Sequence, residues 1–188
     1  MPKSPIQEML PRWAGRIRPY PAGKPIEEVE RELGIKAIKL ASNENPYGPS
    51  PKAIESLRGG LDHVNLYPDS NGLDLARKLA QLHGLDPAEI ILGAGSTDLI
   101  ELAARTFLSP GDEGLVSEAS FLIYQIAVQE SGAGLALIPT RGMAIDLTAI
   151  RQAVTARTKL IYLANPNNPT GTLFTIAEFD RFLDGLPA

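Results

Sequence analysis

The stretch Asn165-Pro166-Asn167-Asn168-Pro169-Thr170-Gly171 follows directly on an apolar run, Leu160 to Ala164. The apolar run predicts a buried strand, and the Asn-Pro steps predict a rigid turn at its carboxyl end. In open α/β folds, ligands bind at the carboxyl ends of parallel strands. The amide of Asn168 carries donors and an acceptor and precedes a proline, so we expect it to hydrogen-bond an oxygen of a planar ligand.

Strand and helix patterns alternate along most of the chain. Strands are predicted at 89–92, 114–117, 135–138 and 159–164, and helices at 51–60, 73–83, 96–108, 121–129, 146–153 and from Thr175, which forms a capping box with Glu178. This alternation predicts an α/β fold with a mostly parallel sheet. The residues before 41 are rich in proline and predict an arm with a short helix closed by Gly34 and a short strand at 37–40.

The composition is that of a globular protein, and it excludes several classes of function. The 188 residues are 44% hydrophobic and carry a net charge of −4 without a basic block, so we expect no nucleic-acid partner. The chain has no cysteine, and His63 and His83 lack the spacing of a metal site, so we expect no metal. Because no apolar segment reaches the roughly 20 residues that span a bilayer and residues 1–13 do not resemble a secretory signal, we expect a cytoplasmic protein.

A glycine-rich loop is the second candidate site. Leu92-Gly93-Ala94-Gly95-Ser96-Thr97-Asp98 follows a predicted strand and begins a predicted helix. Unpaired backbone N–H groups, two hydroxyls and the positive end of the helix dipole would meet there, which suits a phosphate. The loop is not a Walker A motif, since no Gly-Lys-Ser/Thr follows. A plain strand-to-helix turn capped by Ser96 is the alternative.

Aromatic residues are the third group of candidates. Phe121 and Tyr124 lie one helical turn apart, and one of these rings would stack on a flat cofactor unless both are core residues. Three further segments do not indicate a particular chemistry when each is taken alone: Tyr20, the turn cluster 42–48 and Tyr67-Pro68-Asp69.

Taken together and in this order, these segments resemble the histidinol-phosphate aminotransferases, a family of pyridoxal 5'-phosphate (PLP) enzymes in histidine biosynthesis. The resemblance runs from about Ile17 to Pro187. It rests on Arg18-Pro19-Tyr20, on residues 40–51 with Asn43-Glu44-Asn45-Pro46-Tyr47-Gly48, on Leu66-Tyr67-Pro68-Asp69, on Gly93 to Asp98, and on Asn165 to Gly171. The last stretch is shared with the wider aminotransferase family.

The resemblance implies the large domain of a PLP-dependent transferase of fold type I. Residues 1–40 would form an N-terminal arm and a segment of the small domain, and residues 41–188 an incomplete PLP-binding large domain. In the family, three further strands separate the strands that match 89–92 and 159–164. We therefore expect an incomplete sheet with exposed edges.

The resemblance also assigns roles in cofactor binding. Gly95, Ser96 and Thr97 would hold the PLP phosphate at the helix N-terminus. Tyr124 would stack on the pyridine ring, and Asn168 would hydrogen-bond the phenolic oxygen of that ring.

Three further residues would act on the substrate or on a partner subunit. Tyr20 and Asn45 would lie near the substrate, and Tyr67 would reach the neighbouring cofactor phosphate across a homodimer interface. The reaction implied is amino-group transfer between histidinol phosphate and 2-oxoglutarate, so the partners would be a small-molecule amino donor and a keto acid.

No lysine follows Lys159, although the lysine that forms the Schiff base with PLP lies downstream of the 165–171 motif in the family. Lys52, Lys78 and Lys159 are not expected to replace it, because they lie on helix faces or at a strand start. The resemblance therefore implies a chain that stops before this lysine and is inactive alone.

Several alternatives stay open. Threonine-phosphate decarboxylase and aromatic aminotransferases share these loops, and a non-catalytic product of a truncated gene would have the same sequence. A Rossmann-like nucleotide-binding domain would need a third glycine near position 98 and an acidic ribose partner, and neither is present.

Overall fold

The computed structural model describes residues 8–20, 23–40 and 42–187. The chain divides into two compact units by its contacts. The sheet unit comprises Met1–Tyr20 and Gly93–Ala188, and the helical unit comprises Pro21–Leu92. The domain boundary between residues 40 and 41 stays a prediction.

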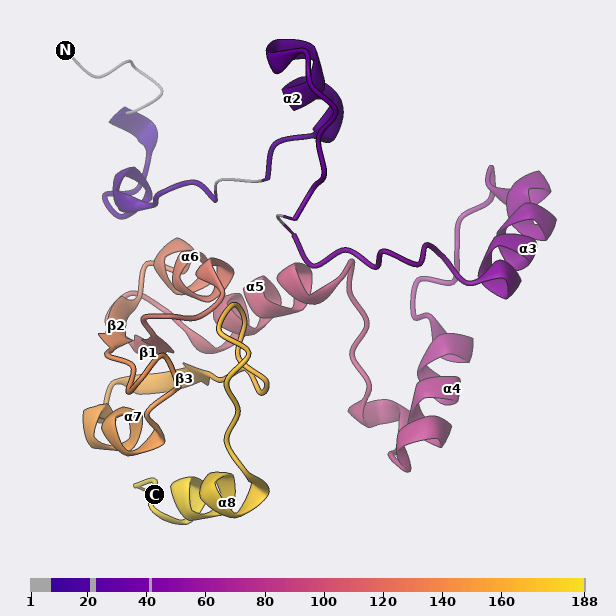
Figure 1. Ribbon diagram of the computed structural model, residues 1–188. Coiled ribbons are helices and arrows are strands. Elements are labelled where there is room, and N and C mark those ends of the chain that lie inside the picture. The colour runs from indigo at the N-terminus through magenta and orange to yellow at the C-terminus, as the bar shows by residue number, and fades with distance from the viewer. Residues whose placement is uncertain (1–7, 21–22, 41, 188) are drawn as a thin grey trace. The chain divides into compact units, whose positions relative to one another are not determined.

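A three-stranded parallel sheet forms the centre of the sheet unit (Figure 1). The strands are β1 (Glu113–Ser117), β2 (Gly134–Ile138) and β3 (Thr158–Tyr162), in the order β2-β1-β3. Strand β1 pairs with both neighbours, so that Leu115 lies opposite Ala136 of β2 and Ile161 of β3. The predicted α/β fold with a parallel sheet is confirmed. Within the described residues β2 and β3 each pair on one side only and are the edges of the sheet.

Helices cover both faces of this sheet. They are α5 (Ser96–Phe107), α6 (Leu122–Glu130), α7 (Leu147–Ala153) and α8 (Ile176–Asp184). Because side chains alternate along a strand, the neighbours Leu115 and Val116 enter different cores. Val116 packs with α5 and α6 in a cluster that includes Val128, and Leu115 packs with Ile150 of α7 and Phe182 of α8. Strand β1 therefore lies at the centre of both cores.

The helical unit has almost no core of its own. Its helices are α2 (Ile26–Leu33), α3 (Pro51–Gly60) and α4 (Leu73–His83), close to their predicted bounds. Gly84 ends α4 in the left-handed conformation at φ 68°, which glycine adopts without the steric cost of a Cβ. Among the described residues of this unit, only Ala76 and Ala80 are buried. No helix in the described ranges is both long and apolar enough to cross a membrane.

Two predicted strands, 37–40 and 89–92, are wrong. Residues 37–40 are irregular, and the second segment begins at the end of a short 3-10 helix, η3 (Pro87–Glu89), and continues as irregular backbone. Two further 3-10 helices are η1 (Ala14–Arg16) and η2 (Leu61–His63). A strand forms only where its backbone groups pair with a neighbour, and neither segment has one in the part of the chain described. An apolar pattern alone does not supply that neighbour.

Tyr162 joins the end of β3 to α5. Its hydroxyl donates a hydrogen bond of 2.5 Å to the backbone oxygen of Ile100, and its ring is buried. Burial raises the pKa of Tyr162 to about 12, because the phenolate would lose its solvation. The neutral phenol of Tyr162 thus connects helix α5 to the carboxyl end of β3 through a hydrogen bond.

Replacing Gly114 by alanine should destabilise the sheet unit. A Cβ there would lie 2.6 Å from Cγ2 of Val128, so α6 would have to move away from β1, at a cost of about 1–3 kcal/mol in unfolding free energy. Gly134→Ala is the matched control, because its Cβ would meet its nearest atom at an ordinary 3.5 Å. Urea unfolding measures both variants, and equal stability of the two would contradict this packing.

Ionisation of Tyr162 should weaken the sheet unit at high pH. The unfolded phenol ionises near pH 10 and the folded one near pH 12, so stabilisation that is complete below pH 10 should be lost as the pH rises through 12. Urea unfolding should show a fall in free energy over this window, and Tyr162→Phe should show a smaller fall. An absorbance titration in which every tyrosine of the folded chain ionises near pH 10 would disprove the expectation.

Candidate functional site

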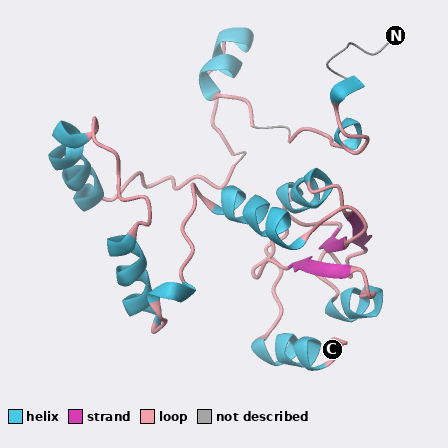
Figure 2. Ribbon diagram, turned by 180° about the vertical axis from the view of Figure 1, so that it is seen from behind, coloured by secondary structure: helices cyan, strands magenta, loops and turns pink. Residues whose placement is uncertain are grey.

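The candidate site lies at one edge of the sheet. Because the strands are parallel, their carboxyl ends share an edge, and the loops 118–121, 139–146 and 163–175 follow there. Helix α5 runs back toward the start of β1 and therefore begins on the same side, as Figures 1 and 2 show. The predicted site residues from residue 93 onward thus gather at the edge where α/β folds bind ligands.

The first turn of α5 holds the residues that sequence analysis assigns to a phosphate site. Gly95 precedes the helix at φ 89° and ψ 177°, a conformation that favours glycine. Ser96 and Thr97 follow it in the first turn, and both are exposed. Their backbone N–H groups have no acceptor in the described part of the chain, as is usual for a first turn. The alternative cap by Ser96 is not observed, since no side chain caps this helix.

Asp98 shapes the loop in front of this turn. Its carboxylate accepts a hydrogen bond of 2.9 Å from the backbone N–H of Ala94. A Cβ at Gly93 would lie 2.8 Å from Oδ2 of Asp98, so a side chain at position 93 would displace this carboxylate. The loop is therefore folded by its own residues, and the N–H groups of Ser96 and Thr97 remain available.

Aromatic rings form a row beside the loop that follows β1. Tyr20 packs edge-on against Phe121 with centroids 6.1 Å apart, and Phe121 packs edge-on against Tyr124 at 5.9 Å. Tyr124 in turn stacks on Tyr162 at 4.9 Å and 11°. Tyr124 is half-buried, and burial raises its pKa. Its ring plane is thus fixed by the core while part of the side chain stays accessible.

The two neighbouring asparagines of the 165–171 loop differ in their surroundings. Asn167 is 3% exposed, and its Nδ2 donates to the backbone oxygen of Ala119 at 2.6 Å and to Oγ1 of Thr170 at 2.8 Å. Asn168 is partly exposed, and its side chain makes no hydrogen bond within the described ranges. Both Asn–Pro peptide bonds of the loop are cis. Of the two amides, that of Asn168 is therefore the accessible one, and its contact with a ligand stays a prediction.

The remaining predicted residues, Asn45 and Tyr67, belong to the helical unit. The Asn45 side chain closes its own turn, because Oδ1 accepts from the N–H of Tyr47 at 3.1 Å and Nδ2 donates to Gly48 O at 2.9 Å. Tyr67 is fully exposed. Their roles at the substrate and at a subunit interface stay predictions.

Sequence analysis missed two contributors to the site, Asn167 and Tyr162. The signal for Asn167 was present, since it lies inside the motif, but residue order does not reveal which of two adjacent amides is buried. Tyr162 ends an apolar run and has no sequence feature that places it under Tyr124. Both are recognised only from contacts between distant segments.

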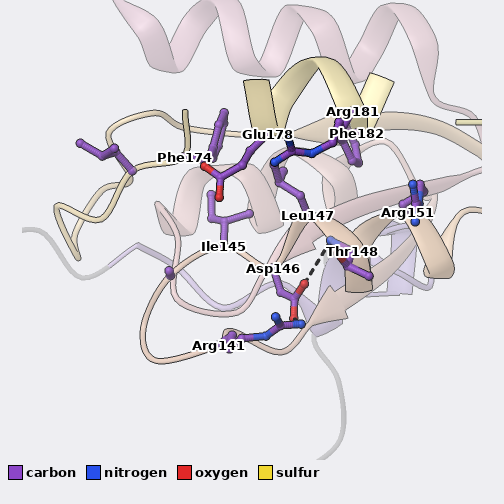
Figure 3. Close-up of a pocket in the computed structure, with 12 residues that line it drawn as sticks. Arg141, Ile145, Asp146, Leu147, Thr148, Arg151, Phe174, Glu178, Arg181 and Phe182 are labelled. Carbon is purple, nitrogen blue, oxygen red and sulfur yellow. Dashed lines mark hydrogen bonds and ion pairs between the residues drawn. The ribbon is translucent and has the colours of Figure 1, made fainter. Parts of the chain in front are cut away.

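A cavity of 460 Å³ lies between α7 and α8, beside parts of the loops 139–146 and 163–175 (Figure 3). Arg141 lines it and pairs with Asp146 at 2.6 Å. Asp146 caps α7, and the backbone N–H of Ala149 is the main cause of its lowered pKa. Glu178 completes the capping box of α8 with Thr175, whose backbone N–H is the chief cause of the lowered pKa of Glu178. These carboxylates hold the helix ends, and none of the predicted site residues lines the cavity.

Two relatives have closely similar sequences. Histidinol-phosphate aminotransferase 2 of Pasteurella multocida is 48% identical over 174 residues, which are 92% of this chain and 48% of that protein. Histidinol-phosphate aminotransferase 1 of Nitrosococcus oceani is 48% identical over 172 residues, 91% of this chain and 46% of that protein. The chain thus spans about half the length of the curated relatives it matches.

Solved structures share the fold. The histidinol-phosphate aminotransferase of Sinorhizobium meliloti, in complex with PLP, has a TM-score of 0.84 at 27% identity over 95% of this chain and 48% of its own. The alanine aminotransferase of Pyrococcus furiosus has a TM-score of 0.71 at 29% identity, over 85% of this chain and 44% of its own. The predicted fold type I and the resemblance to histidinol-phosphate aminotransferases are confirmed.

The family model of class I and II aminotransferases matches residues 35–186, which include both the first turn of α5 and the 165–171 loop. The motif and the sheet edge around it therefore have a common origin with those enzymes: the chain belongs to the aminotransferase class I and II family.

Proposed function

We propose that this chain forms the cofactor-binding part of a PLP-dependent aminotransferase that acts on histidinol phosphate. The proposal is carried by one observation, the open first turn of α5 at the sheet edge that also presents Asn168 and Tyr124. It is supported by the names of the relatives, which are histidinol-phosphate aminotransferases at 44–48% identity.

The residues present fit a phosphorylated planar cofactor. Exposed N–H groups and hydroxyls at the start of a helix suit a dianionic phosphate. A partly exposed tyrosine whose ring plane is fixed by Tyr162 suits a stacked pyridine. An amide without an internal partner suits a phenolic oxygen at the ring.

Each residue then has a defined task. Gly95, Ser96 and Thr97 would hold the phosphate, Tyr124 would limit tilting of the ring, and the Nδ2 of Asn168 would donate to its phenolic oxygen. PLP, when bound, supplies an electron sink for amino-group transfer. The task of the chain is therefore to orient the ring and to stabilise negative charge on that oxygen.

The lysine implied by the family is not assigned to any residue of this chain. Lys159 is the only lysine of the described sheet unit, and it lies near the start of β3, away from the site edge. The proposal includes small-molecule amino donor and keto acid substrates near Tyr20 and Asn45, a homodimer that uses the exposed Tyr67, and a cytoplasmic location.

Cofactor binding by the chain provides the first test. PLP should bind and change its absorbance spectrum, and the double variant Ser96→Ala/Thr97→Val should bind about tenfold more weakly, because it loses two hydroxyl donors to a charged group. Thr106→Val is the matched control, since this hydroxyl lies in the last turn of the same helix and donates to Leu102 O at 2.7 Å. Absence of any spectral change at high PLP concentration would refute the proposed site.

The substrate class can be tested in a chimera. This chain would precede the part of the Pasteurella multocida relative that it does not match, and transamination of histidinol phosphate with 2-oxoglutarate would be measured. Tyr20→Phe and Asn45→Ala should raise KM for histidinol phosphate several-fold and leave PLP affinity unchanged, because both residues are assigned to the substrate.

Tyr47→Phe is the control in this chimera, since Tyr47 is 94% exposed. A folded, PLP-loaded chimera that releases CO₂ from threonine phosphate but does not transaminate would favour the decarboxylase alternative.

A further inference from the structure

We propose that Asn167 is a positioning residue, which fixes the orientation of Asn168 by tying the 165–171 loop to the loops after β1 and β2. This inference deepens the proposed function and rests on it for the ligand that Asn168 contacts. It begins from a contrast between adjacent residues. Asn167 is 3% exposed and bonded on several sides, and Asn168 is partly exposed and without a side-chain partner among the residues described.

The first tie joins the loops after β3 and β1. Nδ2 of Asn167 donates to the backbone oxygen of Ala119 at 2.6 Å, across 48 residues of sequence. Ala119 lies in the short segment between β1 and α6, the helix that carries Tyr124. The asparagine amide thus couples the backbone next to Asn168 to the segment that leads into the aromatic row.

The second tie joins the loops after β3 and β2. Nδ2 of Asn167 also donates to Oγ1 of Thr170 at 2.8 Å, and this hydroxyl lies 2.8 Å from Oγ1 of Thr172. The Thr172 hydroxyl donates to the backbone oxygen of Met143 at 3.3 Å. A chain of polar groups therefore crosses the site edge from the β1 loop to the β2 loop, and its centre is Asn167.

Asn167 also closes the backbone of the loop through two main-chain hydrogen bonds. The N–H of Asn167 donates to Thr172 O, and its carbonyl oxygen accepts from the N–H of Gly171, both at 2.8 Å. Asn168 and Pro169 lie inside this closed turn. Since the Asn168 side chain has no bond of its own within the described ranges, its direction is set by the backbone that Asn167 holds. A contact to a ligand requires placement within about 0.5 Å, which a loose turn does not provide.

One atom of Asn167 has no partner. Its Oδ1 is buried and accepts no hydrogen bond from the residues that the structure describes. An aspartate at this position would keep the volume but lose both donor bonds and place an unpaired carboxylate oxygen beside the oxygen of Ala119. Asn167→Asp should therefore disturb the loop more than Asn167→Ala does.

The test is made on the chain without cofactor. In Asn167→Ala, nuclear magnetic resonance relaxation should give a lower order parameter for the Asn168 side-chain amide. Hydrogen exchange of the Gly171 amide should become about tenfold faster or more. Both changes are expected because hydrogen bonds that hold the turn are lost. Ser131→Ala is the control, since it removes a part-buried bond of 2.7 Å to Val128 O at the far end of α6. It should change neither quantity.

A second pair of variants decides the matter if Asn167→Ala does not fold. Thr170→Val removes the hydroxyl that links Asn167 to Thr172, and Thr170→Ser retains it. The inference is supported if the order parameter of the Asn168 amide falls in the valine variant and is restored in the serine variant. An unchanged order parameter at Asn168 in the valine variant overturns the inference, as does an unchanged order parameter in Asn167→Ala where that variant folds.

Cofactor titration separates this inference from the proposed function. If PLP binds, Asn167→Ala should weaken it about tenfold in the wild-type background and have little further effect in an Asn168→Ala background, since the first residue acts through the second. Equal effects in both backgrounds would overturn the inference. Failure of the unmodified chain to bind PLP would count against the proposed function. The order parameter of the Asn168 amide would still decide the role of Asn167.

Discussion

The parallel pairing of β1 with both of its neighbours is the constraint on which the rest of the sheet unit depends. It buries Leu115 on one face and Val116 on the other, so that four helices pack around a single strand. It also brings three carboxyl ends to one edge, where backbone hydrogen bonding of the sheet stops and loops begin. Every site residue of this unit from residue 93 onward owes its place to that alignment.

At this edge, some polar groups hold the structure and others are left free. Asn167, Thr170 and Asp98 have hydrogen-bond partners, which for Asn167 include the backbone of Ala119 in the loop after β1. The N–H groups of Ser96 and Thr97 and the amide of Asn168 have none among the described residues. Ligand binding by a loop requires both kinds of group, because free donors select the ligand only when the backbone that carries them is held.

The helices and the parallel sheet were predictable from local patterns, because caps, glycine ends and apolar periodicity act within a few residues. Gly34 and Gly84 closed their helices as expected, and the Thr175 and Glu178 capping box formed. The segments 37–40 and 89–92 failed for the opposite reason, since strand formation depends on a distant neighbour. The first turn of α5 and the exposed Asn168 were predictable from their motifs, whereas the stack of Tyr124 on Tyr162 was not.

The sequence by itself determined the family, the order of the elements and the candidate residues for cofactor binding, because these are encoded in short contiguous motifs. Only the tertiary structure decided which of two adjacent asparagines is buried, and which rings support Tyr124. The physical reason is that burial and stacking are set by segments 38 to 48 residues apart, which meet only when β1 and β3 pair.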